Sequence, residues 1–511
     1  MGAFMSARRN ETPRPRRRHK PSHAESRPSV PWEPFLRAIE RLDRAVNDLR
    51  RRAPDFSAAT PFPVWQQTVM LGVPAIFTAA LILLDESGFI LWSLTLALPF
   101  LLIAIVRLVA VWHVLKRQPK FRRAPVGDRR FDTRLPTFSV LIPVYQEVAV
   151  IPDLVAAMRW LDYPPDRLEI LFITEEQDQP TRHALLRAGL ARNMRILTVP
   201  AGQPRTKPRA LNYALQDARG ILVTVYDAED VPDRDQLRRA ADAFIEGGPR
   251  LACVQAQLAI YNANQSFLSR QFALEYAALF RGLLPALAYL KLPIPLGGTS
   301  NHFRRDLLLK CGGWDPFNVT EDADLGIRIA RLGYDVTVIQ SATLEEAPAF
   351  WRTWRGQRTR WIKGWIQTYL VHMRHPRKLW RDLGTWQFMG FQVMIGGMIL
   401  SFLVHPWFYI LLADAALTGG ELMPANSLLR WVCGGHLAIG YGAAWLLTIV
   451  TALGSVRRLW SAVWLPIYWL AMSWAAYCAV VDLIFRPFHW EKTAHGAGAR
   501  HRDILPKSGL P

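Results

Sequence analysis

The chain divides into long apolar runs toward both ends and a middle region in which apolar and polar segments alternate. Five apolar runs are each close to the ~20 residues that a helix needs to cross a bilayer. They span residues 65–84, 89–113, 386–413, 429–453 and 463–485. A single water-soluble core cannot plausibly bury five such helices, so the pattern predicts an integral membrane protein.

In the middle region, short apolar runs bounded by turn residues alternate with segments of helical periodicity. The apolar runs are Phe138–Pro143, Leu168–Ile173, Met194–Val199 and Ile221–Tyr226. Strict alternation of strand and helix predicts a parallel sheet wrapped by helices, whose ligands bind beyond the carboxyl ends of the strands. We therefore expect a Rossmann-like α/β domain with its site at that edge of the sheet.

Positive charge gathers on both sides of the first apolar pair. Residues 1–60 hold 14 Lys and Arg against 7 Asp and Glu, and residues 114–135 hold 8 against 2. This positive-inside pattern predicts that both ends of the first hairpin, and with them the α/β domain, are cytosolic in a bacterial-type inner or plasma membrane. The formal net charge of +20 is then explained by topology and by contact with membrane lipids, and we expect no nucleic-acid partner.

These patterns predict six segments along the chain. They are a basic, mobile cytosolic tail without a cleavable signal peptide (1–60), a transmembrane hairpin (61–115), the α/β domain (134–350), amphipathic interfacial helices (351–385), C-terminal transmembrane helices (386–486) and a tail (487–511). The four cysteines are scattered singly and indicate neither a disulfide framework nor a zinc site.

Two acidic groups follow the strands of the predicted sheet. Asp227 and Glu229 leave the fourth strand on a tight loop, where carboxylates can hold Mg²⁺ or Mn²⁺, with Asp230 as the rival second ligand. The alternative is that these acids only favour the start of the next helix. Glu175 and Glu176 end the second strand, where an acid can reach a nucleoside, although two exposed glutamates can also be plain solvated charge.

Asp322 is the candidate general base. It ends Thr320-Glu321-Asp322, directly before a helical pattern, and a carboxylate placed there can take a proton from an acceptor hydroxyl. Helix capping by Thr320 is the alternative reading and is compatible with catalysis. Lys207, with Arg209 nearby, begins another helical pattern and can supply cation and backbone amides to phosphate; the alternative is a surface lysine.

The segment from Trp351 to Tyr369 combines an aromatic stripe with basic residues. The stripe consists of Trp351, Trp354, Trp361 and Trp365, and the basic residues are Arg352, Arg355, Arg358, Arg360 and Lys363. A basic amphipathic helix with interfacial tryptophans is typical of a helix that lies along a membrane surface.

Together, these signatures resemble the processive membrane glycosyltransferases of family 2, such as cellulose, hyaluronan and poly-N-acetylglucosamine synthases. The resemblance rests on Phe138–Glu147, the Glu175-Glu176 pair, Lys207–Asn212, Tyr226–Asp230, Val319–Asp322 and Gln357–Trp361, in this order. It implies a cytosolic domain of the GT-A type beside an α-helical transmembrane region. Glu229 stands where the family usually has Asp.

The resemblance also implies roles for individual residues. Asp322 would be the base, and Asp227 and Glu229 the metal ligands. The nucleotide sugar would contact Pro143, Tyr145, Glu147, Glu175, Lys207, Asp227 and Arg360. The acceptor would contact Gly298, Thr299, Gln357 and Trp361, with His302 more typical of a structural histidine.

The expected reaction is inverting transfer from a UDP-sugar, UDP-glucose or UDP-N-acetylglucosamine, to a growing β-linked polysaccharide, coupled to export through the chain's own helices. Transfer to a membrane lipid is the alternative. A transporter is disfavoured, because few charges lie in the apolar runs.

Five crossings would place the basic C-terminal tail outside, against the charge rule. Either one run is re-entrant, with His405-Pro406 as the break, or a small partner subunit completes the bundle. The segment His489–Thr493 is the candidate for a gating loop over the donor.

Overall fold

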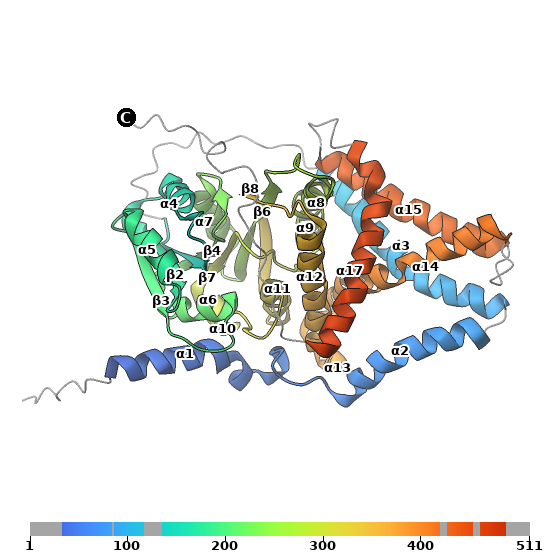
Figure 1. The fold of residues 1–511 in the computed structure, drawn as a ribbon, viewed down its shortest axis with the longest axis horizontal. Coiled ribbons are helices and arrows are strands. Elements are labelled where there is room, and N and C mark those ends of the chain that lie inside the picture. Colours follow the sequence, from blue (N-terminus) through green and yellow to red (C-terminus); the bar gives the residue numbers. More distant parts are fainter. Residues whose placement is uncertain (1–32, 84–85, 117–134, 420–426, 453–459, 487–511) are drawn as a thin grey trace, which may run out of the picture.

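The computed structural model describes residues 33–83, 86–116, 135–419, 427–452 and 460–486. In this part of the chain, a sheet domain lies beside a helical bundle (Figure 1). The proposed gating segment His489–Thr493 lies outside the described residues.

One mixed sheet of eight strands forms the centre of the sheet domain, in the order β3-β2-β1-β4-β7-β6-β8-β5. Strands β1 to β4 are mutually parallel, as their alternation with helices predicts, whereas β7 runs antiparallel to both β4 and β6. The strands are β1 (Phe138–Val144), β2 (Leu168–Glu175), β3 (Met194–Val199), β4 (Leu222–Val225), β5 (Val231–Pro232), β6 (Leu251–Ile260), β7 (Asn301–Arg304) and β8 (Asp335–Glu345).

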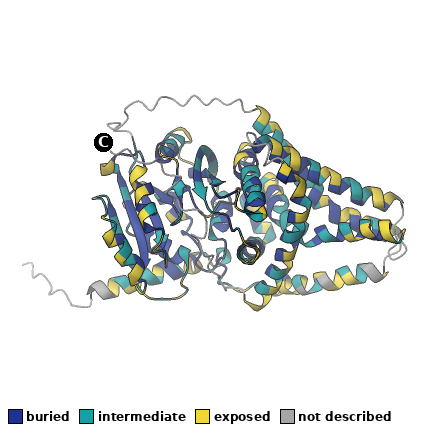
Figure 2. Cartoon of the chain, turned by 45° about the horizontal axis from the view of Figure 1, so that its top comes forward, coloured by how far each residue is buried: buried dark blue, intermediate teal, exposed yellow. Residues whose placement is uncertain are grey.

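Helices cover both faces of this sheet, because alternate residues of each strand point to opposite sides. On one face Val140 and Ile142 pack with α4 (Ile151–Trp160), α5 (Gln179–Arg187) and α7 (Gln236–Glu246). On the other face Leu141 packs with α6 (Lys207–Leu215), α10 (Arg305–Lys310) and α11 (Glu321–Arg331). The apolar strands are therefore buried on both sides, as parallel strands require (Figure 2).

Residues 33–60 differ from the mobile tail that composition predicts. They form helix α1 (Glu33–Arg52) and the short turn η1 (Pro54–Phe56), and α1 packs against α6. Arg41 forms an ion pair of 3.0 Å with Asp217, and the backbone oxygen of Arg41 accepts a hydrogen bond of 2.9 Å from Gln216. The apolar side of α1, including Ala45 and Leu49, is buried against the domain, which fixes the helix there.

Two helical segments join the sheet domain to the bundle. Helix α8 (Phe267–Tyr276) continues through the π-helix η4 (Ala277–Leu283) into α9 (Leu284–Tyr289). Helix α12 (Trp351–His372) packs along α17 (Leu465–Phe485), and α13 (Pro376–Phe391) follows it. The buried Lys363 of α12 forms an ion pair of 2.5 Å with the partly exposed Asp482 of α17, which ties the two helices together.

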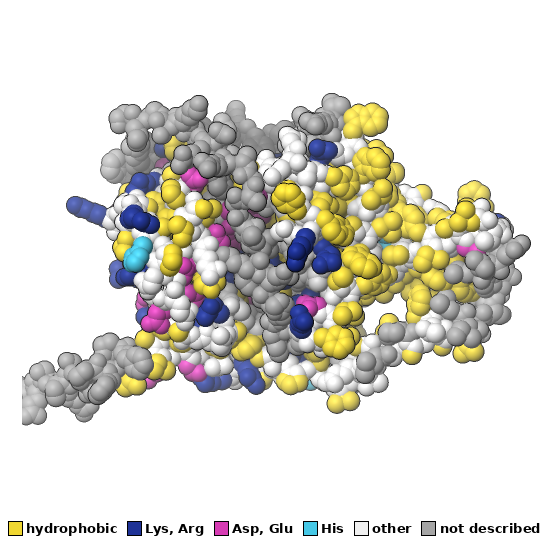
Figure 3. All heavy atoms as spheres, in the orientation of Figure 1, with side chains coloured by type: hydrophobic (Ala, Val, Ile, Leu, Met, Phe, Trp, Pro, Cys, Tyr) yellow, Lys and Arg dark blue, Asp and Glu magenta, His cyan; other side chains and the backbone are white. Residues whose placement is uncertain are grey.

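The bundle contains α2 (Val64–Leu83), α3 (Glu86–Lys116), the π-helix η5 (Gln392–Gly397), α14 (Met398–Leu417) and α15 (Ser427–Thr451). In the described residues, four helices are long and apolar enough to cross a membrane: Ser87–Lys116, Pro376–Leu417, Leu428–Thr451 and Ala462–Phe485. The predicted run 65–84 forms α2 but is not among these four. Hydrophobic side chains gather on this side of the surface (Figure 3).

The arrangement of the helices bears on the odd number of expected crossings. Helices α2, α3, α14 and α15 extend to a common tip, whereas α17 runs beside α12 at a steep angle to them (Figure 1). The expected break at His405-Pro406 does not occur, because α14 is a continuous helix through Pro406. In the described residues, the four helices that are long and apolar enough to cross a membrane include α17 and not α2, so the side on which each end of the bundle lies stays a prediction.

The Lys363–Asp482 pair gives a stability prediction. Substituting Lys363→Met leaves the Asp482 carboxylate without its cation, and because water reaches part of that carboxylate we expect the free energy of unfolding to fall by about 1 kcal/mol. The double variant Lys363→Met/Asp482→Leu should recover most of this loss, because it removes both charges. Thermal unfolding in detergent micelles measures the stability of both variants. The control is Arg352→Met, a substitution of an exposed residue on the same helix. If the single and double variants lost the same free energy of unfolding, the stabilising role of this ion pair would be contradicted.

Candidate active site

A pocket of about 310 Å³ opens at the carboxyl ends of the parallel strands. Its wall is built from the loops after β1, β2 and β4, the start of α6, the start of α11 and the middle of α12. All but one of the predicted site residues line it: Pro143, Tyr145, Glu147, Glu175, Lys207, Asp227, Glu229, Gly298, Asp322, Gln357, Arg360 and Trp361. The exception is Thr299.

One end of the pocket carries an aromatic ring and a buried acid. The Tyr145 hydroxyl accepts a hydrogen bond of 3.1 Å from Arg205, whose guanidinium lies 5.8 Å from the ring centroid. Glu175 is almost fully buried and forms an ion pair with Arg209. Arg209 therefore points at Glu175, and not at a phosphate as its position near the start of α6 suggested.

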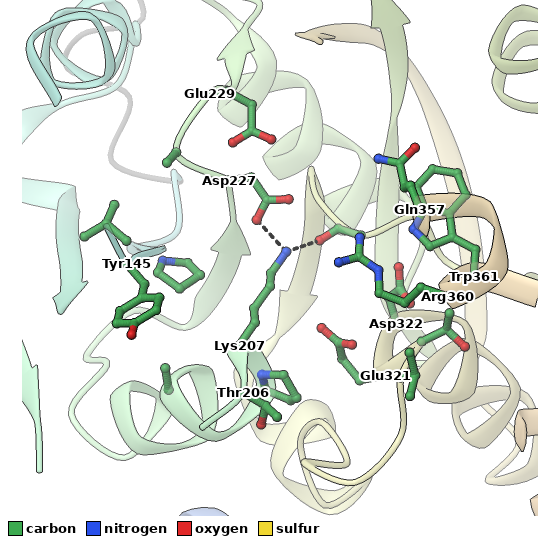
Figure 4. A pocket seen from close by; sticks show the side chains of 18 of the residues that line it. Tyr145, Thr206, Lys207, Asp227, Glu229, Glu321, Asp322, Gln357, Arg360 and Trp361 are labelled. Carbon is green, nitrogen blue, oxygen red and sulfur yellow. Dashed lines mark hydrogen bonds and ion pairs between the residues drawn. The ribbon is translucent and has the colours of Figure 1, made fainter. Parts of the chain in front are cut away.

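Lys207 lies at the centre of the pocket. Its ammonium group donates to Asp227 Oδ1 at 2.5 Å and to the Gly298 carbonyl at 2.7 Å. Burial alone would lower the pKa of Lys207, but the charges of Asp227 and Glu321 outweigh burial and raise it. The lysine is therefore held as a cation, and the Arg360 side chain reaches toward the same region from α12 (Figure 4).

The acidic side chains of the loop after β4 lie in two different places. Asp227 and Glu229 line the pocket, whereas Asp230 is buried behind it and accepts hydrogen bonds from the Asp227 backbone N–H (2.7 Å) and the Thr299 hydroxyl. Asp230 thus shapes the loop, which favours Glu229 over Asp230 as the second metal ligand. The Thr299 hydroxyl is occupied inside the protein, so this residue does not line the acceptor end as predicted.

The two pocket carboxylates fit a divalent cation. Carboxylate oxygens are hard ligands, and Mg²⁺ is commonly held by one or two of them together with substrate phosphates. Among the described residues, no group of three or more His, Cys, Asp or Glu side chains forms a metal site by itself. The protein would therefore supply only part of the coordination shell.

Asp322 stands in the first turn of α11, facing the pocket. Its Oδ1 accepts a hydrogen bond of 2.8 Å from the Ala323 backbone. Gly298 lies close to its other oxygen: a Cβ added to Gly298 would be 3.3 Å from Asp322 Oδ2. Burial raises the pKa of the Asp322 carboxyl, and burial together with the Asp322 charge raises the pKa of Glu321 to about 8. Thr320 stands at the N-cap position of this helix with acids in the first turn, as the capping alternative expects, although its side chain makes no capping hydrogen bond.

Helix α12 approaches this turn closely because residue 364 is glycine. A Cβ on Gly364 would lie 2.4 Å from Thr320 Cγ2 and 2.8 Å from the Thr320 backbone nitrogen. These distances are far below contact, so only glycine permits the observed spacing. The close packing sets α12, with Gln357, Arg360 and Trp361, against the start of α11, where Asp322 stands.

The end of the pocket nearest α12 is aromatic. Trp361 lies nearly parallel to the Tyr276 ring of α8, with 6.5 Å between centroids, and 5.8 Å from the centroid of Phe272. Gln357 and Trp361 lie together on this side in Figure 4, across the pocket from Tyr145. An aromatic wall of this kind can stack on a sugar ring or cover an apolar group.

The basic residues of α12 are less exposed than a membrane-surface helix would make them. Arg358 is buried, donates to both carboxylate oxygens of Glu275 at 2.8 and 2.7 Å, and lies 4.2 Å from the Phe272 ring centroid. Lys363 is buried against Asp482. Of the five basic residues, Arg358 and Lys363 therefore lie in contacts between the domain and the bundle, Arg360 lines the pocket, and Arg352 and Arg355 are exposed.

His302 is a structural residue. It is fully buried on β7, its Nδ1 lies 2.6 Å from the Thr224 hydroxyl, and burial lowers its pKa to about 3.

Sequence reasoning missed several lining residues. They include Arg205, Thr206, Phe272, Tyr276, Pro316, Phe317, Glu345 and Glu346. Glu345 ends β8 and Glu346 follows it, the same signal of acids at a strand end that marked Asp227. The rings of α8 gave no such signal, because an aromatic residue in an apolar helix is ordinarily part of the core.

With this geometry in place, the comparisons identify the class of the domain. Residues 136–364 match the family described as "Glycosyltransferase like family 2". The probable glycosyltransferase YdaM of Bacillus subtilis is 28% identical over 275 residues, which are 52% of this chain and 65% of that protein. The sheet domain with the first half of α12 is thus the part of the chain that matches this family of glycosyltransferases.

Other relatives act on different acceptors, according to their names. The beta-monoglucosyldiacylglycerol synthase of Trichormus variabilis is 29% identical over 294 residues, covering 55% of this chain and 60% of that protein. The cellulose synthase catalytic subunit of Pseudomonas fluorescens is 26% identical over 269 residues, covering 51% of this chain and 35% of that protein. The matches thus span about a third to two thirds of the curated relatives' length.

Among solved structures, a mannosyltransferase from Pyrobaculum calidifontis, in complex with GDP-Man and Mn²⁺, is 20% identical, with a TM-score of 0.48 over 76% of this chain and 98% of that one.

The contact at Gly364 predicts an effect on activity without loss of fold. Gly364→Ala forces α12 away from Thr320, and a displacement of about 1 Å can cost roughly 10²-fold in rate. We expect kcat for sugar transfer to fall by about that factor while the melting temperature changes little. Gly435→Ala is the control, because a Cβ there meets nothing within 4 Å. Wild-type kcat in Gly364→Ala would show that the close approach is not needed.

Proposed function

We propose that this protein transfers a sugar from a nucleotide sugar to an acceptor hydroxyl at a membrane, with inversion at the anomeric carbon. The observation that carries the proposal is the convergence, in one pocket, of Lys207, Asp227 and Arg360 with the partly buried carboxylate of Asp322. Cations suited to a diphosphate lie between an aromatic nucleoside end and an aromatic acceptor end (Figure 4).

The proposed donor is a UDP-sugar, UDP-glucose or UDP-N-acetylglucosamine. Tyr145 and Glu175 would contact the nucleoside, and Lys207 and Arg360 would hold the diphosphate by charge-assisted hydrogen bonds. When bound by Asp227 and Glu229, Mg²⁺ or Mn²⁺ would neutralise charge on the diphosphate leaving group.

Asp322 acts as the base in this proposal. Its carboxylate takes the proton of the acceptor hydroxyl, the hydroxyl oxygen bonds to the anomeric carbon, and the bond from that carbon to the diphosphate oxygen breaks, releasing the nucleoside diphosphate. A single base and direct displacement invert the anomeric configuration. Burial suits this role, because a carboxylate with a raised pKa is a stronger base than a solvated one.

For the acceptor, our first proposal is a growing β-linked polysaccharide, exported through the chain's own helices. The wall formed by Trp361, Tyr276 and Phe272 supports it, because sugar rings stack on aromatic faces. The second candidate is a membrane lipid. It is favoured by an apolar cavity lined by Trp365, which lies one helical turn beyond Trp361 on α12.

The role of Asp322 predicts a large loss of transfer. Asp322→Asn keeps the size of the side chain but removes the base, so we expect kcat to fall by about 10²- to 10⁴-fold. The measurement is nucleoside diphosphate release by detergent-purified protein, across a panel of UDP- and GDP-sugars with Mg²⁺ or Mn²⁺. Asp306→Asn, an exposed acid on α10, is the control. Sizing the product separates polymer from glycolipid, and full activity in Asp322→Asn would refute the assignment.

The raised pKa of Asp322 predicts the acid side of the pH profile. The carboxyl must be deprotonated to act, so kcat/KM should fall as the pH drops through its pKa. Because burial raises that pKa, the midpoint should lie above the ordinary aspartate range near 3.8. A profile that stays flat down to pH 4, measured over the pH range in which the melting temperature is unchanged, would contradict a buried aspartate base.

A further inference from the structure

A second cavity, of about 190 Å³, lies inside the helical bundle. Helices α3, α12, α14, α15 and α17 and the π-helix η4 contribute to its wall. Most of the lining is aliphatic or aromatic, with Phe100, Phe402, Trp469 and Met472 as examples. Dry apolar cavities of about 150 Å³ already hold small hydrocarbons.

Arg107 of α3 brings a positive charge to this apolar cavity. It lies nine residues before the end of α3 at Lys116, or about 14 Å along the helix axis. Its guanidinium stands 4.7 Å from the Trp469 ring centroid. In the part of the chain that the structure describes, Arg107 makes no ion pair and no hydrogen bond, so only the aromatic ring compensates its charge.

Other buried cations near the bundle have matched partners. Arg358 binds Glu275 through two hydrogen bonds, and Lys363 pairs with Asp482 at 2.5 Å. A cation without a counter-ion among apolar helices is costly, and such a residue is by default a functional one. Glu275 also lines the cavity, but Arg358 holds both oxygens of its carboxylate, so the anion for Arg107 is left to a ligand.

Two further polar groups line the same cavity on α14. His405 is 3% exposed, and its Nδ1 has no hydrogen-bond partner, although its Nε2 lies 2.6 Å from the Tyr441 hydroxyl. The Ser401 hydroxyl also has no partner in the described protein. An apolar cavity with a few convergent polar groups is the usual form of a small-molecule site.

We propose that this cavity binds an anionic amphiphile, with its hydrocarbon chain against the apolar wall and its phosphate or carboxylate on Arg107, near Ser401 and His405. A carbohydrate fits less well, because the wall offers few hydrogen-bonding groups for its hydroxyls. A free anion fits poorly too, because it would leave the apolar wall uncovered. Binding at this site does not require sugar transfer.

The lining offers a matched pair of variants that test the site. Gly440 lines the cavity and Gly442 does not, yet a Cβ at either position meets nothing within 4 Å. Gly440→Leu should therefore fill the cavity without disturbing α15, and Gly442→Leu is its control. Arg107→Gln removes the charge, and its control is Lys116→Gln, an exposed cation at the end of the same helix.

The experiment is titration of the full-length protein in neutral detergent, read by native mass spectrometry. The ligands are phosphatidic acid, phosphatidylglycerol, phosphatidylcholine, diacylglycerol, a short β-glucan and inorganic phosphate. We expect one anionic lipid to bind per chain, with affinity about tenfold lower in Arg107→Gln and at least as much lower in Gly440→Leu. Both controls should bind as the wild type does.

Several results would overturn the proposal. Equal weakening by Lys116→Gln would indicate non-specific surface lipid, and equal binding of diacylglycerol would remove the role of Arg107. Binding of phosphate alone would indicate an ion site, and displacement of lipid by the glucan would indicate a carbohydrate path. Asp322→Asn protein, run in parallel, should bind lipid normally, so a failure of the proposed transfer activity and a failure of this site remain distinguishable.

Discussion

The packing of α12 is the constraint on which the site depends. One face of this helix reaches the base through the contact of Gly364 with Thr320. Other positions tie it to α8 through Arg358 and Glu275, and to α17 through Lys363 and Asp482. The side chains that complete the pocket, Gln357, Arg360 and Trp361, lie on the same stretch of α12 as these attachment points. The position of the bundle therefore sets the geometry of the acceptor end.

This arrangement explains why the catalytic domain and the membrane helices occur in one chain. The parallel strands present the donor site at their carboxyl ends, as the fold requires. The strands of the sheet do not supply the aromatic wall of the pocket near α12, which comes from two helices. Trp361 comes from α12, and Tyr276 and Phe272 come from α8, the two elements that also contact the bundle.

Much of this was predictable from the sequence. Apolar runs of strand length fixed the parallel half of the sheet, and polar residues at strand ends identified Asp227, Glu229 and Glu175. Hydrophobic periodicity alone could not predict that β7 is antiparallel, because the neighbours of a strand in the sheet depend on how distant segments of the chain are arranged. Composition suggested a mobile N-terminal tail, but the apolar face of α1 finds a complement on α6 that only the folded domain displays.

The errors in the site have a common physical cause. Sequence gives the type of a side chain but not its partner, so Arg209, Arg358 and Lys363 looked available for phosphate or lipid, whereas each is paired with an acidic side chain. Thr299 is likewise occupied by Asp230. Conversely, Arg107 lay inside an ordinary apolar run, and only the absence of a partner around it in the described structure marks it as unusual.

The most direct test of the central claim is a structure of the protein in lipid nanodiscs with UDP and Mn²⁺. The account predicts that the diphosphate lies between Lys207 and Arg360, that the cation lies against Asp227 and Glu229, and that the nucleobase lies beside Tyr145. Density for the nucleotide elsewhere, or an occupied pocket in which α12 makes no contact with it, would contradict the account.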